Sequence, residues 1–251
     1  MKNKKRLLLL CLCMAAIATA SVFGTMALLT DTDSAVNTFT VGKVDITVDE
    51  TKVNPDGTMA IDAEAERVKS NEYHLLPGMT YLKDPTVTLL KGSENAYIRM
   101  ILTVHGADTV QAIIDAHQLG DFSVFIGDWN QETWLYKGFS TDEENNTISF
   151  EFRYKEIVPG ADSDTSLLPL FKKLIVPGEI TGEEIQKLHE NNFKLEVFGH
   201  AIQATGFTDL TDEQTGEIKT AEDAAWEAFE KQLEKSKPAQ PDPTDNPEES
   251  P

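Results

Sequence analysis

The chain has 251 residues, a formal net charge of -20 and only two cysteines. Both cysteines, Cys11 and Cys13, lie in one apolar segment near the N-terminus, so the rest of the chain has no thiol. Once that segment is removed, disulfide-stapled folds, cysteine nucleophiles, thiolate zinc sites and iron–sulfur centres are excluded. The excess of acidic over basic residues, 42 against 22, argues against nucleic-acid or anionic-membrane partners, because such binding relies on basic side chains that neutralise phosphates.

The N-terminal segment predicts an export signal. Four basic residues among the first six precede an apolar run over residues 7–29, and Thr25-Met26-Ala27 supplies a small-x-small cleavage site. We therefore expect a signal peptide over residues 1–27, cleavage between Ala27 and Leu28, and a secreted mature protein. The alternative is an uncleaved membrane anchor, since the run is about long enough to span a bilayer.

Alternation of apolar and polar side chains recurs along the mature chain and predicts short antiparallel strands. The strands are expected near residues 44–49, 97–104, 122–126, 148–154 and 193–201. So many short strands in one chain favour a mainly β, two-sheet sandwich. Three Pro-Gly pairs, at residues 77–78, 159–160 and 177–178, predict type II turns in which the glycine has a positive φ.

Three short helices are expected between the strands. The first spans residues 109–118, and the second follows Thr181, which opens a capping-box pattern with Glu184. The third follows Thr220 and carries an apolar stripe that needs a partner surface. We thus expect a sandwich over residues 28–208, a helical extension over 209–236 that packs on it, and a disordered, acidic, proline-rich tail over 237–251.

Several sequence blocks resemble the TasA/camelysin family, whose precursors are processed by a signal peptidase of the SipW type. The blocks are residues 24–31 (GTMALLTD), 37–46 (NTFTVGKVDI), 76–87 (LPGMTYLKDPTV), 92–99 (GSENAYIR), 198–207 (FGHAIQATGF) and 225–229 (AWEAF). The resemblance implies a jelly-roll sandwich and a structural role at the cell surface or in a biofilm matrix. It also implies self-association into fibres and contact with other matrix or cell-surface proteins.

The start of the mature chain combines a Thr/Asp/Ser-rich segment with a strand-forming end, which is suited to adding a strand to a neighbour's sheet. The expected donor strand contains Phe39, Val41, Val44 and Ile46. An ordinary first strand, paired within its own sandwich, is the alternative. The family resemblance favours donation, because members that polymerise insert such a strand into the next subunit.

No catalytic motif is present. The zinc-peptidase pattern H-E-x-x-H begins at His189-Glu190 and fails at Phe193, and no nucleophile elbow, P-loop or dinucleotide-binding turn occurs. The acidic loops at residues 142–146 and 162–164 lack the spacing of an EF-hand, so solvated loops are favoured over calcium sites. We expect no catalytic residue and no cofactor, with zinc or calcium as the alternative. The rival functions are a camelysin-like metalloendopeptidase and a monomeric surface binding module.

Overall fold

The computed structural model describes residues 36–38, 43–59, 66–211 and 215–236 of the chain. Three expectations fall outside these ranges: the signal peptide with its cleavage site at Ala27 and Leu28, the donor positions Phe39 and Val41, and the tail over residues 237–251. Within the described ranges, no helix combines the length and the apolarity needed to cross a membrane.

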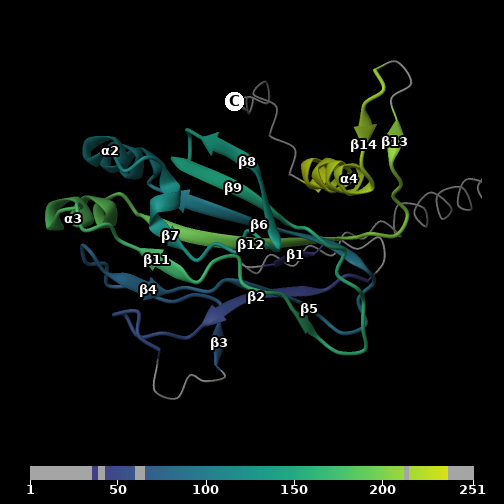
Figure 1. Ribbon diagram of the computed structural model, residues 1–251, viewed down its shortest axis with the longest axis horizontal. Helices are drawn as coiled ribbons and strands as arrows, with labels where there is room; N and C mark the ends of the chain where they lie inside the picture. The colour runs from purple at the N-terminus through teal and green to yellow at the C-terminus, as the bar shows by residue number, and fades with distance from the viewer. Residues whose placement is uncertain (1–35, 39–42, 60–65, 212–214, 237–251) are drawn as a thin grey trace, which may run out of the picture. The chain divides into compact units, whose positions relative to one another are not determined.

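The fold is mainly β, as the alternation predicted, and its largest element is a five-stranded sheet (Figure 1). The strand order is β1-β12-β6-β9-β8, and every pairing is antiparallel except that of β1 with β12. The strands are β1 (Val36–Thr38), β6 (Ala96–His105), β8 (Trp134–Asp142), β9 (Thr147–Tyr154) and β12 (Lys194–Gln203). The long strands predicted near residues 97–104, 148–154 and 193–201 are thereby confirmed.

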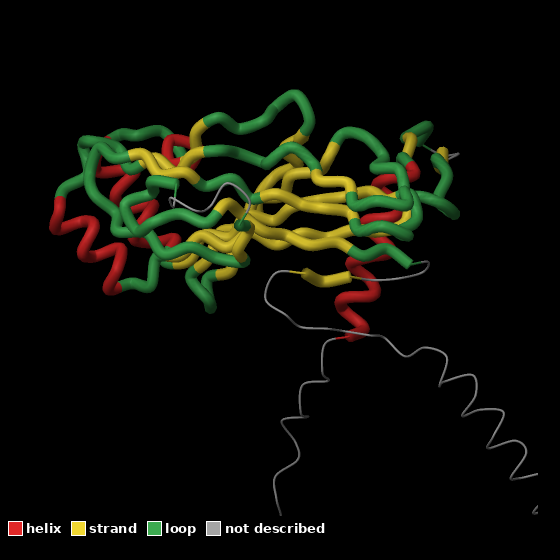
Figure 2. Tube along the Cα trace, turned by 90° about the horizontal axis from the view of Figure 1, so that it is seen from below, coloured by secondary structure: helices red, strands yellow, loops and turns green. Residues whose placement is uncertain are grey.

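In Figure 1 two smaller sheets are drawn below this sheet, and the hairpin of β13 and β14 is drawn above it at the right. One has the order β10-β5-β2-β3, another the order β4-β11-β7, and β13 and β14 form a separate hairpin. Their strands are β2 (Ile46–Thr51), β3 (Arg67–Val68), β4 (Thr80–Leu82), β5 (Thr86–Leu89), β7 (Ile126–Gly127), β10 (Thr165–Ser166), β11 (Lys173–Ile175), β13 (Leu210–Thr211) and β14 (Ile218–Lys219). Figure 2 shows the strands as stacked layers, with α2 and α3 at one end.

A single apolar cluster fills the space between the layers. Val44, Ile46 and Val48 alternate with half-buried polar residues along β2 and its lead-in, and they join Met100 and Leu102 of β6 in the core. Gly199 of β12 marks a close approach, because a Cβ atom there would lie 2.4 Å from Val48 Cγ2. The two layers are therefore in direct contact where β12 packs against β2.

The helices are α2 (Ala107–His117), α3 (Gly182–Glu190) and α4 (Ala221–Ser236). The predicted capping box is confirmed: Thr181 Oγ1 accepts from the Glu184 backbone N–H, and the Glu184 side chain accepts from the Thr181 backbone N–H. Helix α4 buries Ala225, Trp226 and Phe229 in a second cluster with Ile202 of β12. Since Ile202 follows the core residue Ala201, α4 covers the face of β12 that points away from the sandwich interior.

One strand prediction is wrong. Residues Phe122–Phe125 form a 3₁₀ helix, η1, and only Ile126–Gly127 are extended, as β7. The Asp121 side chain accepts a hydrogen bond from the Ser123 backbone N–H over 2.8 Å and so caps this turn. Phe122 and Phe125, three residues apart, are both buried, which fits the 3₁₀ period of three better than the expected alternation.

The turn predictions are correct at one Pro-Gly pair and wrong at two. Gly78 has a φ of 74°, as a type II turn requires, whereas Gly160 and Gly178 have no positive φ. Gly160 instead accommodates a close approach of the chain, because a Cβ atom there would lie 2.0 Å from the carbonyl oxygen of Ser93. At this position glycine is required for space and not for its backbone angle.

Candidate functional site: an open sheet edge and its cleft

In the part of the chain that the structure describes, the outer edge of β12 is only partly covered. On its inner side β12 pairs with β6 from Lys194 to Gln203, whereas on its outer side β1 reaches only Gly199, His200 and Ala201. Among the described residues, no strand pairs with the outer side of residues 194–198. Such an edge presents unpaired backbone N–H and C=O groups, to which another strand can pair.

The strand that covers the other part of this edge has three residues. β1 spans Val36–Thr38 and runs parallel to β12, in the register Val36 to Gly199 and Thr38 to Ala201. Parallel pairing is slightly less stable per residue than antiparallel pairing, and three residues form few inter-strand hydrogen bonds. Among the described residues, the pairing of β1 with β12 is therefore limited to three residue pairs.

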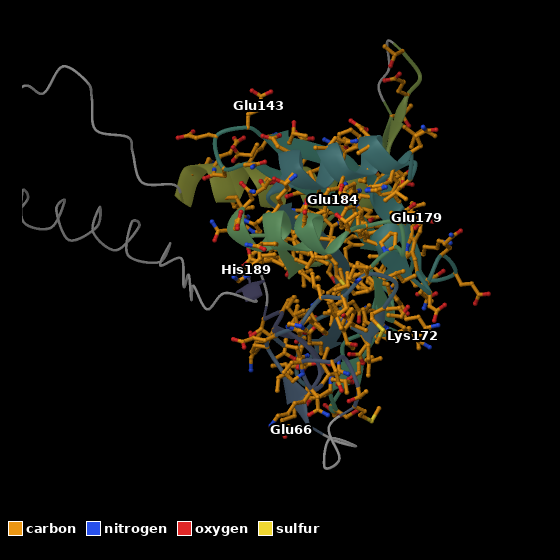
Figure 3. The ribbon with its side chains drawn as sticks, turned by 90° about the vertical axis from the view of Figure 1, so that its left-hand side faces the viewer. Glu66, Glu143, Lys172, Glu179, Glu184 and His189 are labelled. Atoms are coloured by element: carbon orange, nitrogen blue, oxygen red, sulfur yellow. The ribbon has the colours of Figure 1, made fainter. Side chains whose placement is uncertain are left out.

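A cleft of about 630 Å³ opens beside the uncovered part of β12. It lies between β12, β2 and the loop that follows β3. Its lining is Val48, Asp49, Glu50, Lys69, Ser70, Asn71, Glu72, Tyr73, Leu75, Lys83, Pro85, Leu174, His189, Phe193, Lys194, Leu195, Glu196 and Val197. A second cleft of about 480 Å³ adjoins it toward α3. The two clefts share Tyr73, Leu75, His189 and Phe193 in their lining. Figure 3 is a view of the ribbon in which two side chains of α3, His189 and Glu184, are labelled.

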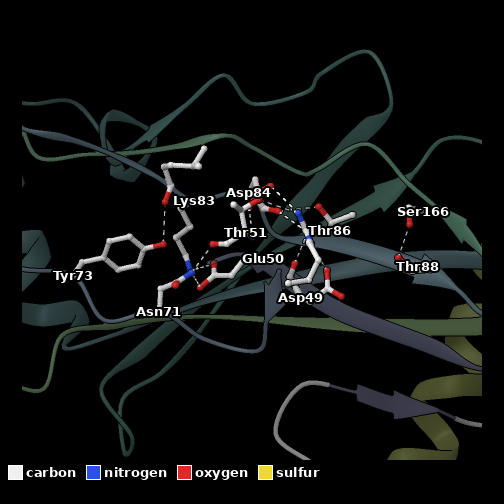
Figure 4. Close-up of polar contacts among 12 residues, drawn as sticks. Asp49, Glu50, Thr51, Asn71, Tyr73, Lys83, Asp84, Thr86, Thr88 and Ser166 are labelled. Atoms are coloured by element: carbon white, nitrogen blue, oxygen red, sulfur yellow. Dashed lines mark hydrogen bonds and ion pairs between the residues drawn. The ribbon is translucent and has the colours of Figure 1, made fainter. Parts of the chain in front are cut away.

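A buried polar cluster forms part of the wall of this cleft (Figure 4). Glu50 Oε2 lies 2.6 Å from Lys83 Nζ, and both side chains are less than a tenth exposed. Asn71 Nδ2 donates to Glu50 Oε1 over 3.0 Å. One carboxylate therefore binds a lysine ammonium group and an asparagine carboxamide, which come from two segments separated in sequence.

Both the oxygen and the nitrogen of the Asn71 carboxamide form hydrogen bonds. Its Oδ1 accepts from the backbone N–H of Val53 over 3.0 Å, and its Nδ2 also donates to the carbonyl of Thr51 over 2.9 Å. Tyr73 closes the other side of the cluster: its hydroxyl donates to the Leu82 carbonyl, and its ring centroid lies 5.6 Å from Lys83 Nζ. Burial and, after it, the charge of Glu50 raise the pKa of Tyr73, so this hydroxyl stays protonated.

A second polar group ties the neighbouring strands together. The Arg67 guanidinium on β3 binds Asp49 of β2 over 2.8 Å and Asp84 over 2.9 Å. Asp84 also accepts from the backbone N–H of Thr51 over 2.7 Å. These contacts hold β2, β3 and the segment after β4 in a fixed arrangement around Glu50 and Lys83.

The expected donor strand is divided by the structure. Val44 and Ile46 are buried in the core of their own chain, and Ile46 pairs with Leu89 of β5. These two positions thus serve the sandwich itself, and a donated segment has to lie closer to the N-terminus. Phe39 and Val41 lie outside the described residues.

The histidines are distributed over separate contacts. His105 binds Glu196 over 2.7 Å, His117 of α2 binds Glu184 of α3 over 2.9 Å, and His200 accepts a hydrogen bond from Arg99. Within the described ranges, no group of three or more His, Cys, Asp and Glu side chains is arranged to hold a metal ion.

In each of the two acidic loops considered for calcium, a carboxylate accepts a hydrogen bond from a backbone N–H group. Asp142 accepts from the backbone N–H of Asn145, and Asp164 accepts from that of Lys91.

The cluster of Glu50, Asn71 and Lys83 was not predicted from the sequence. One signal was present: Glu50 continues the inward-facing series of Val44, Ile46 and Val48, so a charged residue occupies a core position of the alternation. No spacing rule linked it to Asn71 or Lys83, because their meeting depends on how β2, the loop after β3 and the end of β4 pack together.

Comparison with known proteins found no matching family model, no matching curated protein and no matching solved structure.

Proposed function

We propose that this protein is an exported, jelly-roll structural protein of the cell surface or extracellular matrix, and that its mature form assembles into fibres through its N-terminal segment. A neighbour's segment adds to the open edge of β12. The observation that carries the proposal is the three-residue parallel strand β1 on an edge that is otherwise uncovered among the described residues.

The small contact of β1 favours exchange between chains. A strand that forms few hydrogen bonds with its own chain loses little free energy when it leaves, and a neighbour's edge offers the same pairing in return. Val44, Ile46 and Val48 are buried in the core and anchor the chain from residue 44 onward. Exchange of β1 therefore leaves the sandwich folded.

The register of β1 defines where the rest of the segment would lie. In the proposed assembly, a neighbour's segment that keeps the register of β1 brings its residues 31–35 opposite residues 194–198 of β12. Asp31 would then come opposite Lys194, whose side chain is well exposed. The apolar side chains of Leu195 and Val197 in the adjoining cleft would supply surface for the added strand.

Electron microscopy of the mature chain, residues 28–251, tests the proposal. We expect filaments from the mature chain and none from a variant that lacks residues 28–38, while both remain folded by circular dichroism. Asn37→Pro removes a backbone donor from the centre of β1 and should also reduce filament formation. Asn37→Ser, which keeps that donor, is the matched control and should form filaments.

Sedimentation velocity of the same samples gives the second measurement. A mature chain that stays monomeric at all accessible concentrations would contradict the proposal. Filaments that persist in the variant without residues 28–38 would show that another surface carries assembly.

A further inference from the structure

We propose that Lys83 and Asn71 form an intramolecular isopeptide bond, with Glu50 as the group that transfers the protons. The bond joins Lys83 Nζ to Asn71 Cγ and releases the carboxamide nitrogen as ammonia. The reaction is a transamidation, in which a primary amine and a primary amide give a secondary amide and ammonia. It involves no change of oxidation state and therefore requires no cofactor or oxidant. The inference is independent of fibre assembly.

The first support is that one carboxylate binds both reacting groups. Glu50 holds Lys83 Nζ on Oε2 at 2.6 Å and Asn71 Nδ2 on Oε1 at 3.0 Å (Figure 4). The nucleophile and the leaving group are thereby brought to the two oxygens of a single carboxyl group. Holding two reacting groups in a fixed geometry raises their effective concentration and so lowers the entropic part of the barrier to reaction.

The second support is the orientation of the asparagine. The Val53 backbone N–H donates to Asn71 Oδ1 over 3.0 Å, so it polarises the carbonyl that the amine attacks. The same N–H is placed to stabilise the negative charge that develops on this oxygen in the tetrahedral intermediate. Nδ2 points toward Glu50, from which it can take the proton that lets it leave.

The third support is burial of the lysine and the glutamate, beside the half-buried Asn71 in the wall of the cleft. Lys83 is 8 % exposed and Glu50 is 4 % exposed, and the ring of Tyr73 lies beside the lysine nitrogen. Burial strengthens each of the hydrogen bonds that direct the groups.

The proton balance closes within the cluster. Glu50 accepts a proton from the Lys83 ammonium group, and the neutral amine attacks Asn71 Cγ to form the new C–N bond. In the tetrahedral intermediate, Glu50 donates its proton to Nδ2, and the Glu50 carboxylate then accepts a proton from the former lysine nitrogen. The Cγ–Nδ2 bond breaks, and ammonia is released. Ammonia leaves as ammonium after it takes up a proton, and Glu50 returns to its ionised form.

The bond would close a ring across the chain from residue 71 to residue 83. This segment contains the loop after β3 and the short strand β4, and it forms one wall of the cleft. A cross-link here fixes the wall without a disulfide, in a chain whose two cysteines both lie in the N-terminal apolar segment. Such a covalent tie limits the conformational freedom of the unfolded chain, as a disulfide does.

Mass spectrometry of the mature protein tests the inference. We expect the intact mass, measured in denaturant, to be lower than the sequence mass by one ammonia, about 17 Da. Trypsin should then fail to cut after Lys83, so residues 70–91 are recovered as one peptide that carries the whole mass loss. Cyanogen bromide cuts after Met79, inside the ring, and should leave the two halves of that peptide joined.

Three variants assign the roles. Lys83→Arg removes the nucleophilic amine, and Glu50→Gln removes the proton acceptor, so both should show the full sequence mass. Lys69→Arg is the matched control, because Lys69 also lines the cleft and donates to the Val48 carbonyl. This variant should keep the mass loss and the joined peptide.

The wild-type measurement decides the inference even if a variant fails to fold. A folded mature protein with its full sequence mass would overturn it. A mass loss carried by a peptide of residues 70–83 would also overturn it, since that result indicates a succinimide at Asn71 and a free Lys83. Loss of ammonia that persists in folded Glu50→Gln would overturn the role of Glu50.

Discussion

Arg99 Nε donates a hydrogen bond of 3.0 Å to Nδ1 of His200, and both side chains are buried beneath α4. The Arg99 guanidinium lies 4.6 Å from the ring centroid of Trp226 and 5.0 Å from that of Phe229. It also forms an ion pair with Glu230 over 2.5 Å. One buried arginine of β6 thus attaches α4 to the sheet through cation–π contacts and a carboxylate.

Acidification should weaken the fold through His200. Burial and, after it, the charge of Arg99 lower the pKa of His200 from 6.5 to about 3. Because the folded-state value lies below the unfolded one, the unfolded chain binds the proton more readily, so stability is lost as the pH falls below 6.5. We expect the wild type to lose about 1–2 kcal/mol more than His200→Gln between pH 7 and pH 5.

Urea unfolding at both pH values measures this difference. His74→Gln alters an exposed histidine and should retain the wild-type pH dependence. An equal slope in wild type and His200→Gln would contradict the assignment.

The attachment of α4 should depend on Phe229. This side chain has no exposed surface, and its truncation in Phe229→Ala should cost about 3–5 kcal/mol, as for other buried aromatic residues. Amide hydrogen exchange should also become faster throughout α4. Phe139→Ala makes the same chemical change at a side chain that is 64 % exposed, and it should change stability by less than about 1 kcal/mol. Chemical denaturation of both variants checks the contrast.

The contact of the two layers should depend on Gly199. A methyl group at this position would clash with Val48 Cγ2 and lie 3.3 Å from Ile46 Cδ1, so Gly199→Ala should destabilise the sandwich by about 1–3 kcal/mol. Gly182→Ala is the control, because a Cβ atom there meets nothing within 4 Å and alanine favours the helix. Thermal unfolding should show a lower midpoint for Gly199→Ala alone.

Export should remove the first 27 residues. We expect N-terminal sequencing of the protein from the culture medium to begin at Leu28. Ala27→Tyr places a bulky side chain where the peptidase requires a small one, so the longer precursor should accumulate in the cells. Met26→Ala changes the position between the two small residues and should still be cleaved. A mature N-terminus elsewhere would contradict the predicted site.

Local patterns in the chain were sufficient for the elements whose stability is local. The strands β6 and β9 follow from alternation, α2 follows from the apolar spacing of Val110, Ile113 and Ile114, and the start of α3 follows from Thr181 and Glu184. Each of these signals acts over at most a few residues, within the reach of one strand pleat or one helical turn. The mainly β fold class was predictable for the same reason.

Contacts between distant segments could not be read in this way. The parallel pairing of β1 with β12 joins residues more than 160 positions apart, and the meeting of Glu50, Asn71 and Lys83 requires three segments to pack together. The helical turn at Phe122–Phe125 likewise depends on burial of both phenylalanines. Side-chain periodicity specifies which face of a segment is buried but not what that face meets. The partner is selected by packing of the whole chain, and in this protein that packing brings β1 beside β12 and both Asn71 and Lys83 to Glu50.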